Sequence, residues 1–140
     1  RSLSNTAIRL DILDVVDFSD ELIAVDWYFF AKLLLEDKKA VFTNQAITFY
    51  RQYAENTIGM NDSTLDNLKK GIDVKSLQYK LLSEQGWDFI KELNEINELK
   101  KVVFDEGKMM SYLGCLKKNK IDFPFWWEEI KSLRSSYEVN

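Results

Sequence analysis

Residues 22–35 read LIAVDWYFFAKLLL. Only Asp26 and Lys32 interrupt the apolar run, so a helix formed by it would be apolar around almost its whole circumference. Other helices must cover such a helix on most sides. Crossing a bilayer takes about 20 consecutive apolar residues, and this run is shorter and carries charges. It therefore predicts the central core helix of an all-α fold rather than a membrane span.

Length and composition favour one helical domain. The 140 residues fit a single domain and can bury a substantial core. The aromatic share of 14% is high, whereas one proline and five glycines argue against a loop-rich or all-β fold. We expect one domain over residues 1–140, with residues 1–5 disordered.

Apolar spacing, capping residues and helix breakers predict a compact bundle of six to eight helices around the central run. Residues 8–12 also alternate as a strand would, but no second run is available to pair with them, so helix is favoured. The predicted helices, besides 22–35, cover residues 8–16, 43–59, 63–71, 73–86, 87–104, 109–119 and 124–137.

Several chemistries lack their usual residues. The chain has no histidine, which removes the commonest general base and metal ligand. Its one cysteine cannot form an intramolecular disulfide or a structural zinc site. No glycine-rich phosphate loop is present. We therefore expect no enzyme activity, no cofactor and no bound metal, although carboxylates alone could still hold magnesium.

The most distinctive stretch is FPFWW at residues 123–127, where a proline stands at the predicted start of the last helix. One side of a core cannot easily take all of these rings, so some would stay exposed as an anchor for a partner. The alternative is that a neighbouring hairpin covers them. The predicted partner-binding residues are Phe123, Phe125, Trp126, Trp127 and Glu128.

Three other features have a structural and a functional interpretation. Asp26 could be a functional acid, or it could lie on a polar seam that reaches water. Cys115 could be a reactive thiol or a small buried side chain. Met109 and Met110 could form an adaptable groove or simply fill core. The structural interpretation is favoured in each case.

These observations favour a non-catalytic, regulatory protein-interaction module that is intracellular and cytoplasmic, because a single cysteine suits a reducing compartment. The expected partner is another protein or a second copy, with no membrane and, given the net charge of −4, no nucleic acid. One alternative is a bundle that binds an apolar ligand between Trp27, Phe30 and Trp87. Another is a helix-turn-helix domain that binds nucleic acid through one of two lysine clusters: Lys69, Lys70, Lys75 and Lys80, or Lys117, Lys118 and Lys120.

Overall fold

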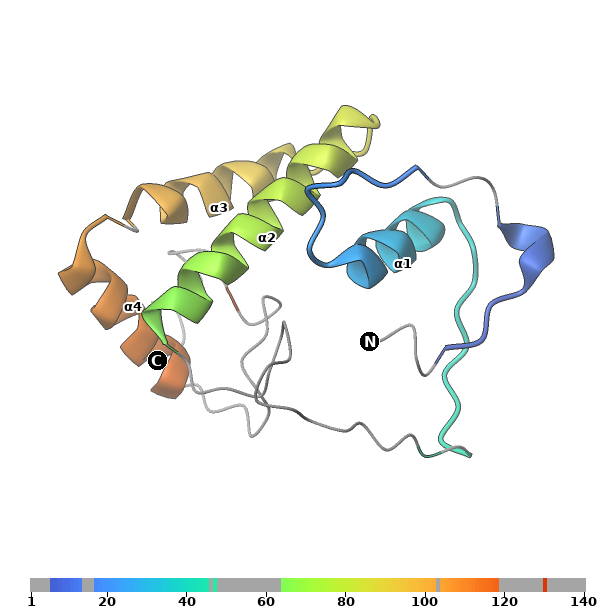
Figure 1. Ribbon diagram of the computed structural model, residues 1–140, viewed down its shortest axis with the longest axis horizontal. Helices are drawn as coiled ribbons and strands as arrows, with labels where there is room; N and C mark the ends of the chain where they lie inside the picture. Colours follow the sequence, from blue (N-terminus) through green and yellow to red (C-terminus); the bar gives the residue numbers. More distant parts are fainter. Residues whose placement is uncertain are drawn as a thin grey trace. The chain divides into compact units, whose positions relative to one another are not determined.

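The computed structural model describes residues 6–13, 17–45, 47, 64–102, 104–118 and 130. In this part of the chain the regular structure is helical throughout and contains no β-strand, which confirms the predicted all-α class. The chain divides into two compact units, Arg1–Arg51 and Gln52–Asn140, and each is described by itself (Figure 1). The prediction that residues 1–140 form one domain stays a prediction.

The described residues form four α-helices, fewer than the six to eight predicted. Residues 8–13 contain only a single turn of 3₁₀ helix, Leu10–Ile12. Residues 43–45 and 47 are not helical, and the rest of the predicted 43–59 helix, like residues 1–5 and most of 119–140, lies outside the described residues. The four are α1 (Val25–Leu35), α2 (Leu65–Glu84), α3 (Ile90–Val102) and α4 (Glu106–Lys118). None of them is long and apolar enough to cross a membrane.

Helix α2 covers two of the predicted helices, 63–71 and 73–86, because the helix does not end at Gly71. Thr64 caps its start by accepting a hydrogen bond from the backbone N–H of Asn67 at 3.2 Å. Gly71 is buried on the same inward face as Leu68 and Ile72, so the helical spacing of apolar residues continues through it. Asp73, predicted to begin a second helix, is exposed and pairs instead with a lysine of α3.

The predicted end of this helix at Gly86 is confirmed. Gly86 has a φ of +93°, in the left-handed region where glycine is favoured. Its N–H donates to the carbonyl of Ser83 at 3.0 Å, and the N–H of Trp87 donates to the carbonyl of Leu82 at 3.2 Å. This pair of bonds is the Schellman arrangement, which satisfies the last carbonyls of a helix and turns the chain away.

In the first unit, α1 begins at Val25 rather than at the start of the apolar run. Tyr28 and Leu33 are its buried residues, while Leu34 is 55% exposed. More of the apolar surface of this helix is therefore exposed than the sequence predicts. The ring of Phe18 meets that of Tyr28 edge-on, with 6.4 Å between the ring centres, and supplies part of the cover.

The turn that follows the end of α1 contains a residue type that is not usual after a helix. Asp37 has a φ of +59°. Its N–H donates to the carbonyl of Leu34 at 3.2 Å, and the N–H of Lys38 donates to that of Leu33 at 3.0 Å. These bonds repeat the Schellman arrangement of α2, with an aspartate in the position that glycine usually takes.

The second unit is built on an antiparallel pair formed by α2 and α3 (Figure 1). Asp73 Oδ1 lies 2.7 Å from Lys100 Nζ, and Ser76 Oγ donates to Asn97 Oδ1 at 3.1 Å. Farther along α2, the ring of Tyr79 stacks on that of Phe89, with 5.6 Å between the ring centres. Burial of Tyr79, together with the nearby carboxylates of Glu92 and Glu95, raises the pKa of its phenol.

Helix α4 contacts both α2 and α3 and completes the described core of this unit. The stripe predicted for α3 is buried at Ile96 and Leu99, and that of α4 at Met109, Tyr112 and Leu113. The buried apolar residues of the unit are Leu68, Ile72, Val74, Leu82, Ile96, Leu99, Met109, Tyr112, Leu113 and Ile130. Helix α2 contributes more of these buried apolar residues than α3 or α4 does.

Candidate functional site

The predicted partner-binding residues Phe123, Phe125, Trp126, Trp127 and Glu128 lie outside the described residues. Their assignment to an interface stays a prediction. The next described residue in the chain is Ile130, which is buried. Its carbonyl accepts a hydrogen bond from Nζ of Lys75 on α2 at 2.7 Å, so the chain is held against α2 just after the aromatic stretch.

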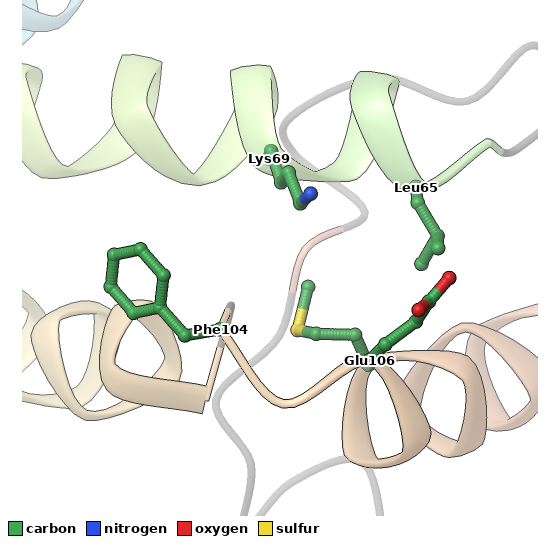
Figure 2. A pocket seen from close by; sticks show the side chains of 5 residues that line it. Leu65, Lys69, Phe104 and Glu106 are labelled. Carbon is green, nitrogen blue, oxygen red and sulfur yellow. The ribbon is translucent and has the colours of Figure 1, made fainter.

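An open groove lies in the second unit, between the first turns of α2 and the corner where α3 meets α4 (Figure 2). Its volume is about 450 Å³. The side chains from α2 and those from the facing corner point towards one another across it. The lining residues are Leu65, Lys69, Phe104, Glu106 and Met109.

Local sequence explains how Phe104 comes to stand at this corner. Asp105 caps α4 by accepting a hydrogen bond on Oδ1 from the N–H of Lys108 at 3.1 Å. That bond also holds the pKa of the Asp105 carboxyl below its usual value. Phe104 precedes this cap and follows the end of α3, so it belongs to neither helix and its side chain is 92% exposed.

Two further lining residues of the groove, Met109 and Leu65, are apolar. Met109 lies in the first turn of α4, where its N–H donates to the carbonyl of Asp105 at 3.0 Å, and it is completely buried. Leu65 opens α2 and is half-buried. A thioether, an isobutyl group and a benzyl ring therefore face the groove together. Met109 thus fills core, as predicted. The same prediction is wrong for Met110, which is exposed.

The two charged lining residues have opposite signs and lie on opposite sides. Lys69 comes from α2 and Glu106 from the start of α4, and both are exposed (Figure 2). Within the part of the chain that the structure describes, neither makes an ion pair, although Lys100, Lys101 and Lys108 close by each do. The described lining thus combines apolar side chains with one ammonium and one carboxylate group.

Two polar side chains of α2 are buried rather than exposed. Lys75 is 9% exposed and Gln78 is 1% exposed. The structure gives neither the oxygen nor the nitrogen of the Gln78 carboxamide a hydrogen-bond partner. Leaving such a group buried and unsatisfied destabilises a fold by about 1–3 kcal/mol.

Replacing Gln78 with methionine should therefore raise the free energy of unfolding by about 1 kcal/mol or more, because an apolar side chain of similar length needs no partner. Urea denaturation followed by circular dichroism measures the change. The same replacement at exposed Gln85 is the control and should have little effect. A clear loss of stability in Gln78→Met would show that the carboxamide is hydrogen-bonded in solution.

The remaining sequence candidates are separate from the groove. Asp26 accepts a hydrogen bond from the N–H of Trp27 at 2.9 Å in the first turn of α1, which fits the polar-seam interpretation. Cys115 is a half-buried free thiol. Trp27 and Phe30 are half-buried in the first unit, and Trp87 is half-buried in the second.

The lysines predicted for a nucleic-acid face do not form one described surface. Lys75 is buried, while Lys69, Lys70 and Lys80 are exposed, and Lys80 lies 3.7 Å from a carboxylate oxygen of Glu84. The predicted break at Gly71, which a helix-turn-helix hairpin would need, lies inside continuous α2. Lys120 lies outside the described residues, as do the side chains of Lys117 and Lys118.

Among the described residues, no group of three or more cysteine, aspartate or glutamate side chains is placed to hold a metal ion. Comparison with protein-family models, with curated proteins and with solved structures found no match for this chain. The groove and the chemistry of its lining are therefore the basis for a functional interpretation.

Sequence reasoning missed Leu65, Phe104 and Glu106 as site residues. One signal could have found the most exposed of them. Phe104 stands immediately before Asp105, a helix-capping residue type that is followed by Glu106 and by the apolar spacing of α4. These signals place Phe104 just before a helix start, outside the preceding helix.

Proposed function

We propose that this chain is a non-catalytic protein-interaction module and that the groove in the second unit is one of its contact surfaces. The observation that carries the proposal is Phe104, a residue that is 92% exposed at the edge of a groove whose lining also includes Leu65 and Met109. A partner that covered the groove would remove this aromatic ring from water. The charged border of the groove is supplied by Lys69 and Glu106.

The anatomy of the groove supports this function. Protein interfaces combine an apolar centre with a polar rim, and aromatic residues are enriched in the centre. Met109 and Leu65 supply the apolar centre, and Phe104 supplies an aromatic side chain that a partner could bury. Burying one aromatic side chain removes about 150–250 Å² from water, which is a large contribution for a single residue.

The aromatic stretch at residues 123–128 is proposed as a second contact surface. Phe125→Ala and Trp127→Ala should each leave folding nearly intact and weaken partner binding by about 2 kcal/mol, the order expected for a hot spot. One chemical denaturation curve per variant tests the folding. If both variants instead lose about 3–5 kcal/mol of stability, these rings are core and the stretch is not an interface.

We also infer that the module is regulatory. We further infer that it works in the cytoplasm, since the single cysteine fits a reducing compartment. Binding of an apolar ligand between Trp27, Phe30 and Trp87 stays an alternative prediction. Nucleic-acid binding is less well supported, because Lys75 is buried and Lys80 lies beside a carboxylate.

Capture of partners from a cell extract by the immobilised chain, read by quantitative mass spectrometry, tests the proposal. Phe104→Ser should lose a captured partner while its melting temperature stays within a few degrees of the parent, because the side chain is exposed. Ile90→Ser is the matched control, since Ile90 is an exposed apolar residue of the same unit outside the groove. If both variants retain every partner of the parent chain, the groove is not a contact surface.

A further inference from the structure

Phe104 protrudes from the same surface that contains the groove. Phe104 is almost fully exposed at the edge of the groove, and the lining of the groove also includes Leu65 and Met109. A cavity of about 150 Å³ is enough to hold a benzene ring, and the groove has a volume of about 450 Å³. The groove is therefore large enough to receive a benzyl side chain such as that of Phe104 from another molecule.

The charges around the groove are also complementary to one another. Lys69 borders it on the α2 side and Glu106 on the α4 side, and neither is paired within the described part of the chain. A partner that brought a carboxylate to Lys69 and an ammonium to Glu106 would pair both. The surface itself carries one of each, so a second copy of the same surface meets this requirement.

We propose that the occupant of the groove is a second copy of this chain, related by a two-fold axis. In a two-fold interface, if residue i contacts residue j of the other copy, then j contacts i. Phe104 of each copy enters the groove of the other, and Lys69 of each copy pairs with Glu106 of the other. The inference rests on the proposed function, because it names the partner of the proposed contact surface.

Sedimentation velocity of the full chain between about 10 μM and about 1 mM tests the proposal, a range suited to a small interface with a micromolar dissociation constant. The parent chain and Ile90→Ser should show the same concentration-dependent dimer. Phe104→Ser should weaken the dimer by about tenfold or more, because it removes the side chain that fills the partner groove. Circular dichroism of each variant confirms that it is folded.

Charge exchange gives a test that no single-chain effect can imitate. Lys69→Glu and Glu106→Lys should each weaken self-association, since each places like charges opposite one another at both symmetric contacts. Mixing the two variants should restore association as a heterodimer, because both contacts then join opposite charges. The double variant K69E/E106K should again form a homodimer.

The outcomes separate this inference from the proposed function. If the chain is monomeric throughout, while Phe104→Ser still loses a partner captured from the extract, the second-copy proposal is overturned and the contact surface stands. If the chain is monomeric and the groove variants lose no partner, both fail. A dimer that persists in Phe104→Ser and in each charge variant forms through another surface and also overturns the proposal.

Discussion

Replacing Leu33 with aspartate should unfold the first unit, whereas the same replacement at Leu34 should leave it folded. Leu33 is buried on α1, while its neighbour Leu34 is 55% exposed. An aspartate at the buried site would have to lose its hydration or else become protonated. That penalty is several kcal/mol, and a domain has a total stability of only about 5–15 kcal/mol.

Thermal melts followed by circular dichroism compare the two variants. A cooperative melt of Leu33→Asp within a few degrees of the parent would show that this side of α1 is not core. The same melts also test the single-domain prediction. If residues 1–140 unfold as one domain, Leu33→Asp should remove the helical signal of α2, α3 and α4 together with that of α1.

Sequence reasoning placed α3, α4 and the end of α2 close to where they lie, because each depends on local chemistry. The spacing of Ile96 and Leu99, or of Met109 and Leu113, fixes one face of a helix whatever surrounds it. Gly86 ends α2 because only a residue that tolerates the left-handed region can turn the chain there. Such signals are present in the residues themselves.

The mistaken break at Gly71 shows where local chemistry is insufficient. Glycine lowers helix stability by about 1 kcal/mol relative to alanine, so an isolated helix would tend to end there. In the fold, Leu68 and Ile72 on either side of Gly71 are completely buried, and packing of this face holds the helix together. Tertiary burial therefore overrides the local preference of glycine, and a single sequence does not show which residues will be buried by tertiary contacts.

The candidate site was hard to predict for a related reason. Phe104 is apolar and would ordinarily be assigned to a core, but the tight connection between α3 and α4 places it outside both helices. Lys75 and Gln78 are polar and would ordinarily be assigned to a surface, but both are buried on α2. In each case the position of a neighbouring helix or segment, rather than the residue type, decides the exposure.

Helix α3 offers the sharpest test of the second unit. Leu99→Ala should lower its free energy of unfolding by about 2–5 kcal/mol, because the side chain is completely buried and its removal leaves a cavity. Ile90→Ala, on the same helix, is the matched control. Ile90 is 63% exposed, so little buried surface is lost there and the change should be within about 0.5 kcal/mol.

Urea denaturation followed by fluorescence measures both variants in chains that keep one of the four tryptophans and carry phenylalanine at the other three. Trp27 then reports on the first unit, or Trp87 on the second. If the two units unfold separately, Leu99→Ala should move only the transition reported by Trp87, because distant and independent sites do not couple. If they form one domain, a single transition should shift for both reporters. Equal curves for Leu99→Ala and Ile90→Ala would show that the buried face of α3 contributes little to stability, and that the pairing of α2 with α3 is not the core of this unit.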